Sequence, residues 1–97
     1  MFTISVEHDP SPMKLEVLDV EAWPIWRKEI STFEWTYTCT EVCYILEGEA
    51  IITPHDGEPV TVRAYDLVNF SEGLRCTWQV VAPITKHYLL KAANHPT

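Results

Sequence analysis

Glu41 is the side chain with the clearest capacity for chemistry, because it lies in a segment rich in aromatic and sulfur-containing residues. If the strands predicted below close into a barrel, this carboxyl group and nearby rings could line one end of its interior. Burial in an apolar cavity disfavours the charged form of a carboxyl group, which makes Glu41 a candidate proton donor or base near neutral pH. Of the four histidines, only His87 alternates onto a face that could point inward, where it could assist Glu41 or serve as a hydrogen-bonded wall residue. The expected walls of this ligand pocket are Trp35, Tyr37, Cys76 and Trp78.

The same residues also allow a purely structural interpretation. Phe33, Trp35 and Tyr37 share one face at a period of two, a pattern that more often fills a core than holds a ligand. The Tyr37 hydroxyl could donate to Glu41 and so satisfy both buried groups. Cys76 would then be a small apolar filler. The basic residues expected on solvated outer faces are Arg75 and Lys86.

Alternation of apolar and polar residues predicts the strands that would hold these groups. The predicted strands cover residues 2–6, 31–38, 41–53, 60–63, 66–70, 75–81 and 84–90. Gly48 predicts a bend or bulge within the longest of them, and Pro83 separates the last two. Residues 54–59 form the predicted hairpin connection. Residues 15–23 stay unassigned, and residues 23–26 are expected to lie as a strap across an apolar surface.

About seven or eight short strands joined by turns predict an all-β sandwich or barrel. A barrel is favoured, because closure removes the exposed strand edges that promote aggregation. We expect one domain over residues 1–97, with an N-terminal strand and strap in residues 1–30 and the barrel core in residues 31–90.

The chain is acidic, with 14 Asp and Glu against 7 Lys and Arg and a formal net charge of −7. This charge repels phosphate backbones and anionic membrane surfaces, so we expect neither nucleic acid nor membrane as a partner. No apolar run approaches the ~20 residues that cross a bilayer, and the N-terminus lacks the pattern of a secretory leader. The three cysteines are an odd set and imply no disulfide framework. We therefore expect a cytoplasmic protein with free thiols.

Glu41 is followed by Gly48 after six intervening residues, and Gly73 and Cys76 come after the predicted strand 66–70. This order resembles the cupin family, whose first motif contains Glu-x6-Gly after two histidines. Closer still is the similarity to small single-domain cupins like the cupin domain of (S)-ureidoglycine aminohydrolases, over roughly residues 23–90. The stretches that carry it begin at Trp23, Phe33, Glu41, Gly73 and Lys86.

The resemblance implies a jelly-roll-like barrel and, in metal-binding members, a transition metal held by three histidines and one glutamate. In this chain the first two histidine positions fall on Trp35 and Tyr37, or on the residues next to them, and the third falls on Cys76. We therefore expect no cofactor. If an ion binds, it would be a divalent transition metal held by Glu41, Cys76 and Tyr37.

The leading hypothesis is a small-molecule-binding cupin with a degenerate metal site, and the sequence leaves open whether it is an enzyme. One alternative is a metal-assisted hydrolase or isomerase of a small nitrogenous metabolite, similar to ureidoglycine aminohydrolase. Another is a structural or regulatory module that acts through a dimer surface. We expect a homodimer, because the large apolar rings exceed what one small barrel can cover.

Overall fold

The structure, a computed structural model, describes residues 3–91 of the chain. These residues form a single sheet of seven strands in which every pairing is antiparallel. The all-β prediction is therefore confirmed. The strands are β1 (Ile4–His8), β2 (Ile25–Lys28), β3 (Ser31–Thr36), β4 (Thr40–Pro54), β5 (Val60–Arg63), β6 (Asp66–Phe70) and β7 (Arg75–Lys91).

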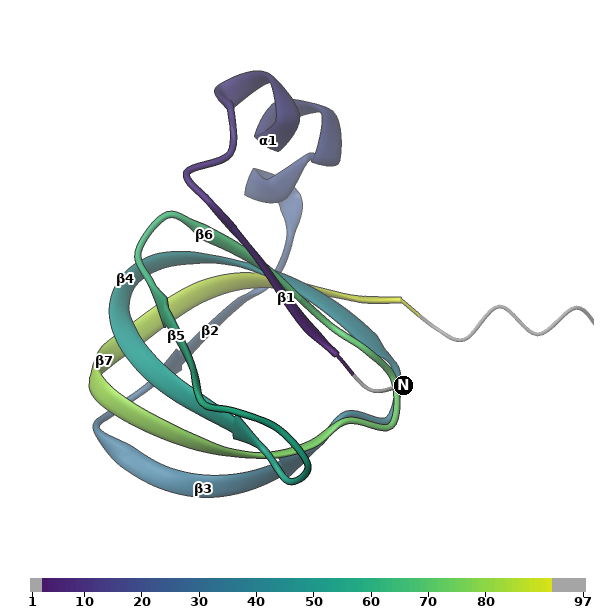
Figure 1. Ribbon diagram of the computed structural model, residues 1–97. Helices are drawn as coiled ribbons and strands as arrows, with labels where there is room; N and C mark the ends of the chain where they lie inside the picture. The colour runs from purple at the N-terminus through teal and green to yellow at the C-terminus, as the bar shows by residue number, and fades with distance from the viewer. Residues whose placement is uncertain (1–2, 92–97) are drawn as a thin grey trace, which may run out of the picture.

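The two longest strands, β4 and β7, pair with each other along their lengths and form the middle of the sheet. β6 and β5 pair with the beginning and the end of β4, and β3 and β2 pair in the same way with β7. β1 extends the sheet beyond β6. Because β4 and β7 are strongly curved, the strands form a ring around a central space (Figure 1). The sheet is a small jelly-roll-like barrel.

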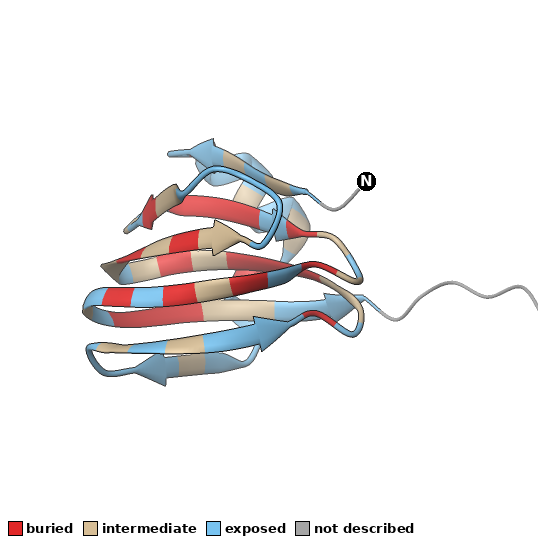
Figure 2. Cartoon of the chain, turned by 60° about the horizontal axis from the view of Figure 1, so that its bottom comes forward, coloured by how far each residue is buried: buried red, intermediate tan, exposed pale blue. Residues whose placement is uncertain are grey.

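The main core fills the concave face of the sheet. On β7, Cys76, Trp78 and Val80 are buried, whereas Gln79 between them is exposed. Figure 2 shows this alternation as buried segments along the central strands, with the edge strands largely exposed. Burying one large apolar side chain stabilises a fold by roughly 1.5–3 kcal/mol, so these inward rows hold the barrel together.

The segment left unassigned from the sequence contains a short helix, α1 (Pro12–Leu18), and a 3₁₀ turn, η1 (Val20–Ala22). The Ser11 hydroxyl caps α1 by accepting the backbone N–H of Lys14, and Asp19 ends it in the left-handed conformation. The two helical segments project from the outside of the barrel (Figure 1). There they pack on a second apolar cluster, whose buried members are Val20, Trp23, Val42 and Leu67.

Gly48 and Pro83 meet where β4 and β7 bend. The register of this pair shifts between Ile45 and Ala50, so the inward residues of β4 change from odd to even numbers across Gly48. The backbone of Gly48 has a φ of 94°, and a Cβ there would lie 2.2 Å from the Pro83 carbonyl oxygen. The bulge predicted at Gly48 is confirmed.

The prediction that Pro83 separates two strands was wrong, because β7 runs without a break from Arg75 to Lys91. A proline cannot donate to a strand ladder, but it is tolerated where the partner strand bulges. The bulge of β4 at Gly48 lies opposite Pro83. β7 therefore continues through Pro83 although this residue has no backbone N–H to donate.

The two ends of the predicted strap lie on opposite faces of the sheet. Trp23 joins the outer cluster, whereas Trp26 belongs to β2 and packs against the inner core. A strand that pairs with β7 thus replaces the expected strap. The N-terminal strand was predicted over residues 2–6; β1 covers Ile4–His8, and Phe2 lies outside the described residues.

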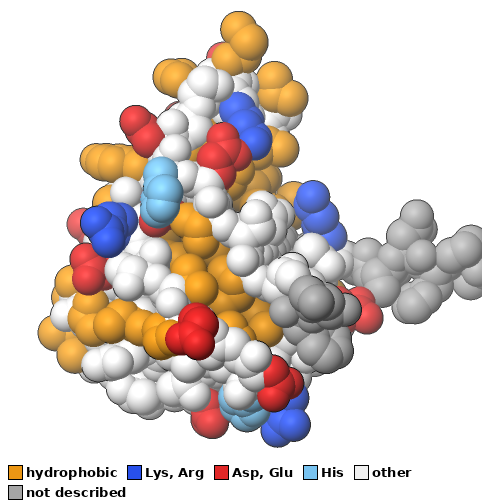
Figure 3. Space-filling view, in the orientation of Figure 1, with side chains coloured by type: hydrophobic (Ala, Val, Ile, Leu, Met, Phe, Trp, Pro, Cys, Tyr) orange, Lys and Arg blue, Asp and Glu red, His pale blue; other side chains and the backbone are white. Residues whose placement is uncertain are grey.

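Among residues 3–91, no helix is long and apolar enough to cross a membrane. Several large apolar side chains are exposed, including Met13 and Val17 on α1, and apolar side chains are visible on this projecting segment in Figure 3. Trp35 and Leu90 are 48% and 54% exposed. The homodimer expected from the sequence stays a prediction.

Candidate functional site

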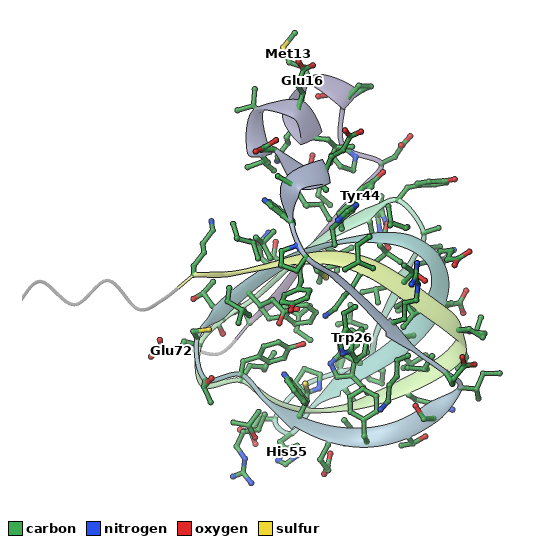
Figure 4. All side chains as sticks on the ribbon, turned by 180° about the vertical axis from the view of Figure 1, so that it is seen from behind. Met13, Glu16, Trp26, Tyr44, His55 and Glu72 are labelled. Atoms are coloured by element: carbon green, nitrogen blue, oxygen red, sulfur yellow. The ribbon has the colours of Figure 1, made fainter. Side chains whose placement is uncertain are left out.

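One end of the barrel holds a pocket of about 220 Å³ whose walls are mostly aromatic. Trp26 from β2 points into the ring of strands and forms one wall, whereas Tyr44 lies outside it near the helical segments (Figure 4). The charged groups among the lining residues are a carboxylate and an ammonium group. The lining residues are Trp26, Phe33, Trp35, Tyr37, Glu41, Trp78, Lys86, Tyr88 and Leu90.

Glu41 and Lys86 form a buried ion pair in this pocket. Lys86 Nζ donates to Glu41 Oε2 at 2.7 Å, and each side chain is 7% exposed. Opposite charges this close offset part of the cost of removing both from water. The inward position expected for Glu41 is confirmed. The outward position expected for Lys86 was wrong, since its ammonium group is the counter-ion of Glu41.

The sequence places Lys86 inside because the even-numbered residues of β7 point inward along the whole strand. Cys76, Trp78 and Val80 begin this row, and Ile84 and Lys86 continue it beyond the bend. In the β4–β7 register Lys86 lies opposite Ile45, and Leu90 lies opposite Glu41. The lysine side chain therefore runs along the inside of the barrel toward the carboxylate, with its apolar stem in the core.

Three aromatic rings surround the ammonium group of Lys86. Its Nζ lies 4.8 Å from the ring centroid of Trp26, 5.0 Å from that of Trp78 and 5.8 Å from that of Phe70. The negative face of an aromatic ring attracts a cation within about 6 Å of its centroid, and more strongly where water is excluded. The pocket is thus built to hold a positive charge at this point.

Tyr37 and Trp78 form a hydrogen-bonded pair in the wall. The Trp78 indole N–H donates to the Tyr37 hydroxyl at 3.1 Å, and the Tyr37 ring stacks on Phe70 with centroids 4.6 Å apart. Burial, and then the charge of Glu41, raises the pKa of the Tyr37 phenol far above its usual range. Tyr37 is therefore a neutral wall residue, and the bond found for its hydroxyl is to Trp78 rather than to Glu41.

Cys76 and Trp35 take different places from those expected. Cys76 is fully buried, and its thiol donates to the Trp35 carbonyl oxygen at 3.7 Å, but it does not line the pocket. Burial raises the pKa of the Cys76 thiol to about 11, so it stays protonated near neutral pH. Trp35 lines the pocket as expected, but it lies half-exposed at the rim.

His87 lies on the opposite face of β7 from Lys86 and does not reach the pocket. Its Nδ1–H donates to the Trp23 carbonyl oxygen at 2.9 Å. The ring borders a separate groove beneath α1, together with Tyr44 and Leu46. The structure therefore separates His87 from Glu41, and the expectation that the two act together does not hold.

Comparison with known proteins gives the family. The profile of the EutQ-like cupin domain matches residues 15–88, most of the chain. The chain belongs to the EutQ-like cupin domain family. No match was found among curated proteins.

This cupin chain is similar to a DUF861 family protein from Thermotoga maritima, with 48% identity and a TM-score of 0.89 over 92% of this chain and 100% of that one. It also shares its fold with a Salmonella typhimurium protein assigned as ethanolamine utilization protein Q, at 24% identity and a TM-score of 0.64 over 72% of this chain and 56% of that one. The Clostridium difficile EutQ protein is 19% identical, with a TM-score of 0.66 over 97% of this chain and 71% of that one. The finer similarity to ureidoglycine aminohydrolases stays a prediction.

The residues of this cupin do not fit a transition metal. The Cys76 thiol donates to the Trp35 carbonyl oxygen and does not line the pocket, and the Tyr37 hydroxyl accepts from the Trp78 indole N–H. Glu41 lines the pocket, but its carboxyl group already accepts from the ammonium group of Lys86. Within residues 3–91, no group of three or more His, Cys, Asp and Glu side chains could hold an ion. The expected set of Glu41, Cys76 and Tyr37 is therefore not a metal site in this arrangement.

The sequence analysis left five of the lining residues out of the predicted pocket: Trp26, Phe33, Lys86, Tyr88 and Leu90. The sequence did carry a signal for Lys86. The alternation that places Cys76, Trp78 and Val80 inward also places Lys86 inward if the strand continues past Pro83. For Trp26 no local signal exists, because its position depends on the pairing of β2 with β7.

Proposed function

We propose that this cupin domain binds a small, uncharged organic molecule, with the ammonium group of Lys86 as the cation beside Glu41. The observation that carries the proposal is the buried Glu41–Lys86 pair inside an aromatic pocket. Buried polar groups at the end of an apolar pocket are the usual means of orienting a small ligand.

The charges of the pocket favour a neutral ligand. The carboxylate and the ammonium group sum to zero, so an added anion would face Glu41 and an added cation would face Lys86. A hydroxyl or amide group can instead donate to Glu41 and accept from Lys86. The volume of about 220 Å³ lies below the roughly 300–1,000 Å³ of pockets for drug-sized ligands. The ligand is therefore small, with a flat apolar part that packs on the rings.

A catalytic alternative rests on the same pair. Glu41 and Lys86 are close enough to pass a proton between a bound molecule and each other, which suits hydrolysis or isomerisation of a small nitrogenous metabolite. The similarity to ureidoglycine aminohydrolase leads to this alternative by analogy alone. This alternative is metal-assisted, so the metal content of the purified protein distinguishes it from the binding proposal.

Two neutral probes, benzyl alcohol and benzamide, test the binding proposal. We expect each to shift the indole N–H resonances of Trp26 and Trp78 in a nitrogen-15 NMR titration, because both rings line the pocket. Glu41→Gln should weaken binding of benzyl alcohol at least several-fold, whereas Glu34→Gln, on an exposed side chain of β3, should leave it unchanged.

Elemental analysis of protein purified without chelator or metal-affinity tag completes the test. We expect much less than one transition-metal ion per chain. A stoichiometric ion would favour the metal-assisted alternative. If neither probe moves the two indole signals, the binding proposal is overturned.

A further inference from the structure

In the aromatic pocket, the primary amine of Lys86 lies beside the carboxylate base of Glu41. Lys86 Nζ is 2.7 Å from Glu41 Oε2, within the range of about 2.6–3.2 Å that joins a nucleophile to its activating base. We propose that Lys86 forms a covalent imine with small uncharged aldehydes or ketones and that Glu41 carries the proton. The inference rests on the proposed pocket function and names its substrate class.

The bond changes balance without any further reagent. Glu41 takes one proton from the Lys86 ammonium group, and the free amine attacks the carbonyl carbon to form a carbinolamine. The protonated Glu41 then returns its proton to the carbinolamine hydroxyl, which leaves as water while the C=N bond forms. One ammonium ion and one carbonyl compound become one iminium ion and one water molecule, and Glu41 ends as a carboxylate.

The aromatic surroundings suit both ends of this reaction. The Lys86 nitrogen carries a charge of +1 in the starting ammonium ion and again in the product iminium ion. The rings of Trp26, Trp78 and Phe70, whose centroids lie 4.8–5.8 Å from Nζ, can therefore stabilise the product as they stabilise the free lysine. The carboxylate of Glu41 is the counter-ion of the ammonium ion at the start and of the iminium ion at the end.

Burial also separates Lys86 from the other lysines. The described lysines at positions 14, 28 and 91 are exposed, whereas Lys86 is buried. Lys14 pairs with Glu7 on the surface, and Lys28 Nζ lies over the Phe33 ring, 5.2 Å from its centroid. Water surrounds such exposed amines and hydrolyses their imines. Selective modification of Lys86 is thus the signature that distinguishes the site from general amine chemistry.

The substrate class follows from charge and size. A carboxylate-bearing carbonyl compound would bring a second negative charge next to Glu41, so neutral compounds are favoured. The pocket volume of about 220 Å³ admits a single small ring or short chain. Benzaldehyde meets both conditions, and benzyl alcohol is its matched control because it has the same ring but no carbonyl group.

The test incubates the full chain with benzaldehyde and sodium cyanoborohydride, whose hydride adds to the iminium carbon and leaves a stable benzylamine. Peptide mass mapping then gives the extent of labelling at each lysine. We expect Lys86 to be labelled at least tenfold faster than Lys28, and an excess of benzyl alcohol to protect Lys86 but not Lys28. Circular dichroism confirms that each variant is folded.

Glu41→Gln tests the proton transfer, with Glu34→Gln as the control on an exposed carboxylate. We expect Glu41→Gln to slow labelling of Lys86 at least tenfold without changing that of Lys28, whereas Glu34→Gln changes neither. Equal labelling of all lysines, or an unlabelled Lys86 in protein that binds benzyl alcohol, would overturn the imine proposal and leave the binding proposal standing. If neither benzyl alcohol nor benzamide binds, the binding proposal fails as well.

Discussion

At the scale of single residues, Glu41 and Lys86 depend on each other. Removing one charge from water to a protein interior costs several kcal/mol, and each of these side chains is 7% exposed. Their contact at 2.7 Å and the rings around Lys86 offset that cost only while both are present. Such a pair adds little net stability, since a well-packed apolar pair of similar volume is often as stable.

A double-mutant cycle measures this dependence. We expect Glu41→Leu or Lys86→Met alone to lower the free energy of unfolding by roughly 3–5 kcal/mol, because each leaves an uncompensated buried charge. The double variant should lose less than either single variant, since no charge remains. Urea denaturation of the four proteins gives the coupling energy. Additive losses would mean that the two side chains do not interact as the structure places them.

At the scale of elements, the crossing of β4 and β7 positions the pocket. The bulge at Gly48 changes the inward parity of β4, so Glu41 and Ile45 on one side and Ala50 on the other all face the core. A regular strand would turn one half of this row toward solvent. The bulge therefore decides which β4 side chains reach the interior.

Gly48→Ala tests this crossing. A methyl group at Gly48 would lie 2.2 Å from the Pro83 carbonyl oxygen on a backbone with φ of 94°. Left-handed geometry alone costs about 1–2 kcal/mol for a residue with a Cβ, and the backbone clash adds to it, so we expect a loss on the order of 3 kcal/mol. Gly57→Ala is the matched control, because its Cβ would meet only the Pro54 side chain at 3.3 Å. Equal urea midpoints for the two variants would contradict this account of the bend.

At the scale of the whole molecule, one sheet serves two apolar layers. Its concave face holds the core and the pocket, and its convex face carries the smaller cluster beneath α1 and η1. The exposure of the three cysteines differs with their place in these layers. Cys43 and Cys76 are fully buried in the inner layer, whereas Cys39 is partly exposed. Burial raises the pKa of the Cys43 thiol to about 12 and that of Cys76 to about 11.

We therefore expect a thiol reagent such as Ellman's reagent to modify Cys39 in the folded protein at pH 8, and Cys43 and Cys76 only after denaturation. Three equally fast thiols in the folded protein would contradict the buried inner layer.

The raised pKa values of Cys43 and Cys76 also make the free energy of unfolding fall at alkaline pH. Both thiols are protonated in the folded and unfolded chain below their usual pKa of about 9, so their contribution to the free energy of unfolding is complete there. This contribution is lost as the pH rises from about 9 through 11–12, because only the unfolded chain releases the protons in that range.

Much of the architecture follows from local pattern. The alternation over Phe33, Trp35 and Tyr37 and the strands at residues 60–63 and 66–70 were predicted with the bounds or faces that the structure shows. Gly48 predicts the bulge at its own position, because only glycine fits a positive φ this close to a neighbouring backbone. These features depend on residues close in sequence or on one backbone requirement, so the chain by itself determines them.

The partner of Glu41 was decided by the tertiary structure. Whether Lys86 or His87 faces inward depends on whether β7 continues through Pro83, and that depends on the bulge of β4, a strand more than thirty residues earlier in the sequence. A proline and a lysine each favour solvent when considered alone. The long-range pairing of β4 with β7 overrides both preferences, and the aromatic rings that gather at that end of the barrel compensate the charge that it buries.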